Sequence, residues 1–584
     1  MKKIIPALLI LLILLSGLPP PALSESVRSP EIILYVGGSG PNNYTKIQDA
    51  INASQPGDRI YVYSGIYYER IVIDKTISLI GESRENTVII NWDERANIVS
   101  IVADGVHMNN FSIVGGMPAG NRGIHLVQFS NNIITNCAIC NTSCGILIGS
   151  PSHSNQIINC TLHNNSYGIR IISSPNNKLR GNSLENNHYN LDVGEIYYQD
   201  IDRSNTINGR PVYYILEQAN LVFNETMNIG YLGLVSCNNI SVYNIELHNN
   251  VQGFLLVNTS YSTLTNCVCH DHSYSLCLLK SSNNQITDFV CYNSGGAGRG
   301  GMDIRHSSNN TLTNCTCYKN YGFRLSGIHL CNSCNNTLIN CVCYHNAEDG
   351  IRLSQLSTNN NIINCSCYEN NYGIELSSSN NKIMSCSCYG NYYGDILLDR
   401  SSSNIVTNCI CKNAGGYGIE LCYSSNCVLT HCQVSGTSKG IYLLGSGNNE
   451  IMSCSCYQNS YGLYLDKSPN NCITNCSFCN NNEDGLYLDK SPNNCITNCS
   501  FSNNHRGLSL FSSPGNRLRS NNLENNRCNL NINGEEISDY HQDITLSNTI
   551  NGKPIYYLIE ENSRVVDGIA DIGYLGIVSC SNIT

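Results

Sequence analysis

One repeated position of the sequence gathers side chains that could transfer protons or hold a sugar. The position is the x of the strand pattern Gly-Ile-x-Leu, and repeat by repeat it is read as Arg305, His329, Arg352, Glu375, Leu397, Glu420, Tyr442, Tyr464, Tyr487 and Ser509. Imidazole, carboxylate and guanidinium groups can serve as base, acid and charge stabiliser, and tyrosine rings can stack on sugar rings. The candidate catalytic residues are therefore Asp303, Arg305, His329, Arg352 and Glu375, and the candidate ligand-binding residues are Glu420, Tyr442, Tyr464 and Tyr487.

Both candidate sets have a structural alternative. Charged side chains on an outward strand face are often merely solvated, and tyrosines repeated at one position can stabilise a sheet as cross-strand neighbours. His306, which follows the first candidates, is expected to turn inward. A second run of tyrosines follows the Cys-x-Cys strands and is expected to be structural: Tyr318, Tyr344, Tyr368 and Tyr389.

An internal repeat of roughly 22 residues must position these side chains. Paired asparagines mark it from about Asn131 to Asn516, and the segment Gly462–Phe478 returns unchanged as Gly485–Phe501. Each repeat holds short strands of alternating sides, and its glycines and asparagines suit turns that need positive φ. The sequence predicts an all-β protein, a single-stranded right-handed parallel β-helix.

Of the 33 cysteines of the sequence, 14 stand in seven Cys-x-Cys strands. Alternation places both cysteines of such a strand in the core, and the second is replaced in other repeats by Ile139, Leu162, Val434, Phe478 and Phe501. An exchange with apolar side chains indicates packing positions, where neutral thiols act as small hydrophobes. We expect reduced thiols, with few disulfides; the pair Cys472 and Cys495 could bridge adjacent coils.

Three segments divide the chain. Residues 1–24 read as a signal peptide, with Lys2 and Lys3 before an apolar run and a small-residue cleavage site. Residues 31–241 are expected to form an N-terminal β-helix with a short amphipathic capping helix within residues 44–54, and residues 242–584 a cysteine-rich β-helix. An Asn-Gly-Arg/Lys-Pro block stands in each, at 205–214 and 548–557, and is expected to be a lateral excursion that rejoins the stack. The chain stops within a coil at Thr584, which predicts an edge open to chain continuation or self-association.

The helix Ile47–Asn52, the repeated Asn-Asn-x-Ile-x-Asn-Cys coil and the Asn-Gly-Lys-Pro-Ile-Tyr-Tyr block resemble the NosD-type parallel β-helix proteins of the pectin-lyase-like superfamily. The resemblance extends from Ile32 to the end of the chain and implies a surface or periplasmic location. It also implies copper as a cofactor by analogy alone, whereas the residues themselves predict neither a cofactor nor a metal site. The cysteine-rich core departs from the usual Ile, Val and Asn of such repeats.

Three functions remain open at this stage. The first is non-catalytic binding of a glycan or cell-wall polymer, by a protein that is secreted to the cell surface. The second is a polysaccharide lyase or hydrolase on the outward strand face, although the Asn-Thr-Asp, Asp-Asp and Gly-His-Gly motifs of polygalacturonases are absent from the sequence. The third is the handling of copper or another soft metal. The net charge of −10 argues against a nucleic-acid partner.

Overall fold

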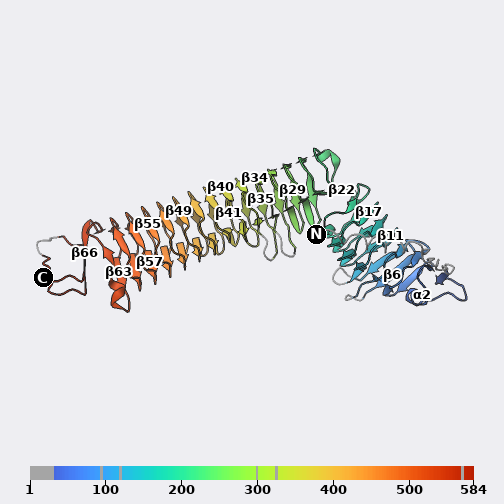
Figure 1. Ribbon diagram of the computed structural model, residues 1–584, viewed down its shortest axis with the longest axis horizontal. Coiled ribbons are helices and arrows are strands. Elements are labelled where there is room, and N and C mark those ends of the chain that lie inside the picture. Colours follow the sequence, from blue (N-terminus) through green and yellow to red (C-terminus); the bar gives the residue numbers. More distant parts are fainter. Residues whose placement is uncertain (1–31, 93–95, 117–120, 297–299, 323–325, 567–570) are drawn as a thin grey trace, which may run out of the picture.

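The computed structural model describes residues 32–92, 96–116, 121–296, 300–322, 326–566 and 571–584. Nearly all of these residues lie in or between short strands that pair in parallel with the strand one coil further on, so the chain winds into a solenoid (Figure 1). Two straight arms meet at an angle near strand β22 (Arg210–Leu216). The predicted parallel β-helix is confirmed, and the predicted signal peptide lies outside the described residues.

A short helix covers the open end of the first arm, as the sequence predicted. Helix α2 (Ile47–Ala53) buries Ile47, Ala50 and Ile51 against the first coil. The carboxylate of Glu69 accepts hydrogen bonds from the backbone N–H groups of Ile47 (2.8 Å) and Gln48 (3.0 Å), which have no partner within the helix. Among the described residues, no helix has the length and apolar character needed to cross a bilayer.

Three parallel sheets form the first arm. They run from β1 (Ile33–Val36) to β20 (Asp200–Ile201), from β3 (Gly65–Tyr68) to β21 (Thr206–Ile207) and from β4 (Ile71–Ile73) to β19 (Tyr189–Gly194). Three further sheets form the second arm. They run from β22 to β63 (Cys528–Asn533), from β23 (Val222–Phe223) to β64 (Asp543–Ile544) and from β26 (Glu246–His248) to β65 (Thr549–Ile550).

The Asn-Gly blocks are hairpins that start new sheets. Asn208 and Gly209 both have positive φ (49° and 77°), and the turn they make sets β22 antiparallel to β21. From there β22 pairs in parallel with β24 (Tyr231–Val235), the next strand of the second arm. The block is thus a hairpin at which the sheets change. The chain still stacks on the first arm beyond it, since the backbone N–H of Asn190 in β19 donates to Asn249 O (2.8 Å).

The second block repeats this arrangement. Asn551 and Gly552 have φ of 49° and 78°, and β66 (Lys553–Ile559) runs antiparallel to β65 before it pairs with β67 (Tyr574–Val578). The two 3₁₀ helices, Glu225–Met227 and Ile537–Tyr540, flank these hairpins.

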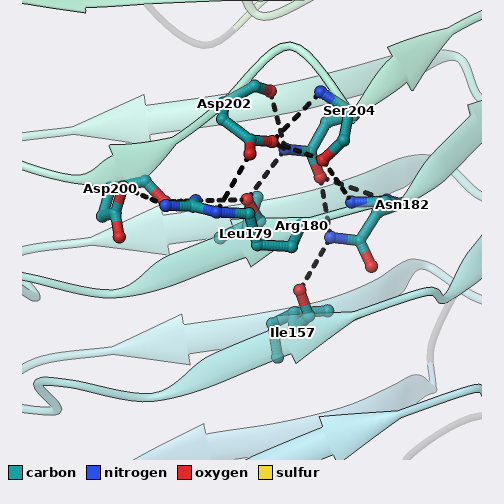
Figure 2. A network of polar contacts seen from close by, with 9 residues as sticks. Ile157, Leu179, Arg180, Asn182, Asp200, Asp202 and Ser204 are labelled. Atoms are coloured by element: carbon teal, nitrogen blue, oxygen red, sulfur yellow. Dashed lines mark hydrogen bonds and ion pairs between the residues drawn. The ribbon is translucent and has the colours of Figure 1, made fainter.

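A polar network closes the last coil of the first arm (Figure 2). The Arg180 guanidinium pairs with the carboxylates of Asp200 and Asp202, the latter with its Nε 3.0 Å from Oδ2. Ser204 donates its backbone N–H to Asp202 Oδ1 (3.0 Å) and its hydroxyl accepts the N–H of Gly181 (2.8 Å). The second arm ends in the same way, since Arg519 Nη2 lies 2.5 Å from Asp543 Oδ2. Ion pairs thus hold the last coil in place where each hairpin begins.

Asparagine and serine ladders run along the turns of the second arm. In one of them the backbone N–H of each asparagine donates to the side-chain oxygen of the next: Asn449 to Asn471 (2.8 Å), Asn471 to Asn494 (2.7 Å) and Asn494 to Asn516 (2.8 Å). These side chains are buried. The ladders therefore satisfy backbone groups that the strands leave unpaired at each turn.

The Cys-x-Cys strands point both thiols into the core, as the sequence predicted. The pairs at 267/269, 315/317, 341/343, 365/367, 386/388, 409/411 and 454/456 are all buried, and all 33 cysteines are free thiols. Cys388 pairs in register with Cys411, and Cys411 with Val434, so one column holds thiols and an aliphatic side chain alike. Cys472 and Cys495 lie in register on the outward side of their sheet and are not bridged.

Candidate functional site

The candidate residues lie on one sheet of the second arm, here called the candidate sheet. The strands that carry them are β33 (Met302–Arg305), β36 (Ile328–Cys331), β39 (Ile351–Ser354), β42 (Tyr372–Leu376), β45 (Gly394–Asp399), β48 (Tyr417–Cys422), β51 (Lys439–Leu444), β54 (Tyr461–Asp466) and β57 (Asp484–Asp489). Inward residues such as Ile304, Leu330 and Leu353 are fully buried. The side chains between them form the outward side, here called the candidate face.

The register of these strands confirms most of the predicted column and corrects its first member. The aligned residues are Asp303, His329, Arg352, Glu375, Leu397, Glu420, Tyr442, Tyr464, Tyr487 and Ser509. Arg305 instead aligns with Cys331, one outward position further along. The sequence held the signal for this, because Gly301-Met302-Asp303-Ile304 fits the Gly-Ile-x-Leu pattern with Asp303 at x. His306, expected to turn inward, is exposed, with a φ of 49° at the end of its strand.

Asp303 is fully buried although it lies on the outward side. Arg305 Nε lies 2.9 Å from one oxygen of the Asp303 carboxylate and 2.8 Å from the other, and His329 Nδ1 lies 3.4 Å from Oδ1. Burial alone would raise the pKa of Asp303, but the hydrogen bond from His329 and the charge of Arg305 outweigh it and hold the pKa below its usual value. The structure thus brings three of the predicted residues together around an ionised carboxylate.

Arg352 lies between two carboxyl groups one coil further on. Its guanidinium Nη2 lies 3.1 Å from Glu375 Oε1, and its Nη1 lies 3.5 Å from Asp349 Oδ2. Burial and the neighbouring Glu375 raise the pKa of Asp349 well above its usual range. Asp349 was not among the predicted residues because it stands in the turn before its strand, outside the Gly-Ile-x-Leu pattern.

Two further carboxyl groups of these strands have a raised pKa: Glu420 on the candidate face, and the fully buried Asp395 beside the core thiols Cys388 and Cys411. Burial raises the pKa of Glu420 to about 7, against the opposing charge of Lys439, and burial also raises the pKa of Asp395 to about 7. Asp395 lies at the start of β45, where it accepts a hydrogen bond from Asn391 Nδ2 (2.7 Å). Of the carboxyl groups on the candidate face, Asp303, Asp349 and Glu375 thus contact an arginine, and the pKa values of Asp349 and Glu420 are raised.

The tyrosines at the other end of the candidate face surround one ammonium group. Lys439 Nζ lies 3.6 Å from the ring centroid of Tyr442, 4.3 Å from that of Tyr464 and 5.5 Å from that of Tyr417. Tyr442 is buried by these contacts, whereas Tyr464 and Tyr487 are half-buried. The rings of Tyr464 and Tyr487 meet edge to face, with centroids 4.9 Å apart and an angle of 83°. A ring edge and a cation, and not three parallel rings, form this end of the face.

The second tyrosine ladder is a continuous stack on another sheet. It comprises His248, His270, Tyr292, Tyr318, Tyr344, Tyr368 and Tyr389, with neighbouring ring centroids 4.7 to 5.4 Å apart and planes within 15° of parallel. Parallel rings at one position of successive coils cover each other's faces, which agrees with the structural role expected for it.

Cavities of the described residues also lie outside the candidate face, and sequence reasoning did not find them. A cavity of ≈ 410 Å³ near the capped end is lined by Tyr35, Tyr61 and Tyr63 together with Arg59. A wider one of ≈ 690 Å³, near the hairpin that joins the arms, is lined mainly by asparagines with His188 and His248. The tyrosines lie in the first coils, which have none of the later repeat pattern that would have aligned them.

The fold and this face define a right-handed parallel β-helix that presents one long polar and aromatic surface. The chain belongs to the family described as periplasmic copper-binding protein (NosD), which matches residues 51–228 and 388–557, more than half of the chain. Residues 231–379 between them match the family described as right handed beta helix region. Each NosD match reaches one of the two Asn-Gly hairpins. No curated protein matches the chain.

Several solved structures are similar to the chain at low identity. The A-module of mannuronan C-5 epimerase AlgE4 from Azotobacter vinelandii is 11% identical over 81% of this chain and 93% of its own, with a TM-score of 0.29. DFA-IIIase from Arthrobacter chlorophenolicus is 13% identical over 57% and 94%, with a TM-score of 0.29. The catalytic domain of a GH87 alpha-1,3-glucanase is 14% identical over 73% and 68%, with a TM-score of 0.23. Identities of this size say nothing about the activity of the present chain.

The described residues do not fit the copper that the family description names. No group of three or more His, Cys, Asp or Glu side chains in the described part of the chain is arranged to hold a metal ion. Copper(I) binds thiolates, whereas burial raises the pKa of core thiols such as Cys411 and Cys456 well above the usual value. In the neighbouring column, hydrogen bonds between the thiols raise the pKa of Cys454 and lower that of Cys476. The column of Cys411 and Cys456 is therefore a packing column, and no copper chemistry is assigned to either column.

Proposed function

We propose that this chain is a secreted or periplasmic β-helix protein that binds a glycan or cell-wall polymer along the candidate face, without cleaving its glycosidic bonds. The observation that carries the proposal is the unbroken register of the face, from Asp303 to Ser509, with a cation and aromatic edges at one end and ion-paired carboxylates at the other. Strands in one sheet follow each other at about 4.8 Å, and a repetitive surface suits a repetitive ligand.

The ion pairs favour binding over cleavage of the polymer backbone. A lyase or glycosidase needs carboxyl groups or bases that are free to exchange protons with the substrate. Here Arg305 contacts both oxygens of Asp303, and Arg352 bridges Asp349 and Glu375. These contacts hold the five side chains in fixed positions, and each of the three carboxyl groups contacts an arginine, which favours hydrogen bonding to a ligand over proton exchange with it. A lyase or hydrolase remains the second candidate function.

The location follows from the first residues and from the family. Residues 1–24 have the charge and apolar run of a signal peptide, and the family to which the chain belongs is described as periplasmic. A glycan of the cell envelope is the polymer that such a protein meets.

A paired set of double variants tests the binding proposal. Tyr464→Ala with Tyr487→Ala removes the half-buried rings of the candidate face, and we expect its affinity in affinity electrophoresis against cell-envelope polysaccharides to fall at least tenfold. Stacking and cation–π contacts of this kind contribute about 0.5–2 kcal/mol each. The loss of two such contacts therefore covers a tenfold loss of affinity, which corresponds to about 1.4 kcal/mol. The control, Tyr368→Ala with Tyr389→Ala, removes an equal pair from the structural ladder. Equal loss of affinity in both, or none in either, would contradict the proposal.

A further inference from the structure

We propose that Ser354, His329 and Asp303 form a nucleophilic triad on the candidate face, and that it hydrolyses acyl esters carried by the bound polymer. The three residues come from three successive coils, in β39, β36 and β33. None of the three was expected to act as a nucleophile, and Ser354 belongs to neither set of residues that the sequence predicted.

The hydrogen bonds connect the three side chains in one series. His329 Nε2 lies 2.8 Å from Ser354 Oγ, and His329 Nδ1 lies 3.4 Å from Asp303 Oδ1. With the proton on Nδ1, the imidazole donates to the carboxylate and accepts the serine proton on Nε2. A serine within hydrogen-bond reach of a base that a third group orients is the arrangement that activates a hydroxyl for attack.

The carboxylate end of the triad is fixed and the serine end is open. Asp303 is fully buried and is held ionised by its contacts with Arg305 and His329. The side chain of His329 is 17% exposed, and Ser354 is half-buried at the end of its strand. A substrate on the candidate face thus meets the hydroxyl, while the group that orients the imidazole is shielded from water.

A positive charge stands beside the serine. Arg352 lies two residues before Ser354 on the same side of β39, and Asp349 and Glu375 fix its guanidinium by contacts of 3.5 and 3.1 Å. A fixed cation next to the nucleophile stabilises the oxyanion that forms when a carbonyl carbon is attacked. The neighbouring backbone N–H groups already donate to the adjacent strand of the parallel sheet. A side chain therefore has to stabilise the oxyanion here.

The step uses water as its only co-reactant. Ser354 Oγ attacks the ester carbonyl carbon while its proton moves to His329 Nε2, and the C–O bond to the alcohol breaks as the imidazolium returns that proton to the departing oxygen. Water then attacks the acyl-serine, its proton moves to His329, and the acid leaves as Ser354 regains the proton. The products are one carboxylic acid and one free hydroxyl on the polymer.

The ester class follows from the position of the triad. A serine on an open strand face reaches substituents that project from a chain lying along the solenoid, so short acyl esters on sugar hydroxyls are the expected substrates. This choice of substrate rests on the proposed function, whereas the triad itself does not. A soluble ester, p-nitrophenyl acetate, therefore tests the triad whether or not a polymer binds.

Ser377 provides a matched control one coil further on. It follows Leu376 as Ser354 follows Leu353, and its hydroxyl donates to Glu375 Oε1 at 2.9 Å instead of contacting an imidazole. Ser354→Ala and Ser377→Ala remove the same atom from equivalent positions. A difference in turnover between the two variants would therefore come from the role of Ser354 in the reaction.

The test combines covalent labelling with turnover. A fluorophosphonate probe should form an adduct on Ser354, found by peptide mapping, in the full chain and in Ser377→Ala. Hydrolysis of p-nitrophenyl acetate should fall by about 100-fold or more in Ser354→Ala and in His329→Gln, with melting temperatures unchanged. Asp303→Asn, which changes a positioning residue, should lower kcat with little change in KM.

Two results would overturn the triad. One is the absence of both an adduct and turnover in the unaltered chain, and the other is equal turnover in Ser354→Ala and Ser377→Ala. Turnover of the small ester with no release of acid from acylated polysaccharides would leave the triad standing and refute the polymer substrate.

Discussion

Replacing one rung of a buried asparagine ladder should destabilise the second arm far more than replacing the residue beside it. Asn481 lies in the ladder and is 2% exposed, whereas its neighbour Asn482 is exposed. Asn481 Oδ1 accepts the backbone N–H of Asn459 (3.1 Å) and its side-chain amide (3.3 Å), and Asn481 Nδ2 donates to Cys456 O at 3.2 Å. The variants are Asn481→Ala and, as control, Asn482→Ala.

The expected cost follows from the groups that each variant leaves behind. Asn481→Ala leaves the buried N–H of Asn459 without its acceptor, which costs about 1–3 kcal/mol. It also removes three further hydrogen bonds of about 0.5–1.5 kcal/mol each, from the side-chain amide of Asn459, to Cys456 O and to Asn504 Oδ1 (2.9 Å). The sum is about 2.5–7.5 kcal/mol. Asn482→Ala keeps the backbone N–H bond to Asn459 O (2.9 Å), and a surface change of this kind stays within about 0.5 kcal/mol.

Hydrogen exchange is the suitable assay, because a solenoid unfolds in parts and a single unfolding free energy describes it poorly. The amide of Asn459 should exchange about 30-fold faster or more in Asn481→Ala, the factor that corresponds to about 2 kcal/mol. Protection in Asn482→Ala should match the unaltered chain. Equal protection of Asn459 in both variants would refute the view that the ladder satisfies buried backbone groups.

Two further predictions concern the thiol core and the acidic groups. Cys411→Val should change the opening free energy of its coil, measured by hydrogen exchange, by less than about 1.5 kcal/mol, because Val434 already occupies the same column. Cys411→Asp should cost several kcal/mol. Retention of zinc or copper that Cys411→Val abolishes would contradict this prediction. Because burial raises the pKa of Glu420 and Asp395 to about 7, both bind their proton more tightly in the folded chain. The melting temperature should fall as the pH rises from about 5 to about 8, and Glu420→Gln with Asp395→Asn should flatten that dependence; an unaltered slope would show that other groups cause it.

Much of the fold could be read from the sequence because it depends on local periodicity. Alternation along the strand places Cys386 and Cys388 inward, and their exchange with apolar residues in other repeats identifies the core without any structure. The capping helix was likewise visible in the spacing of Ile47, Ala50 and Ile51. Each of these inferences needs only the neighbours of a residue within one strand or one helical turn.

The sequence by itself determined the solenoid, its inward and outward columns and the turns, whereas only the tertiary structure decided which outward side chains meet. The repeat pattern aligns Asp303 with His329, but only the structure shows that His329 Nδ1 comes within 3.4 Å of the Asp303 carboxylate. The Asn208–Gly209 turn reverses the chain because both residues adopt positive φ, which sequence similarity between the two blocks did not reveal. Ser354 and Ser377 follow the same pattern in sequence, and only the coil beneath Ser354 brings an imidazole within 2.8 Å of its hydroxyl. Contacts between coils are set by packing across the stack, and that information is absent from any single repeat.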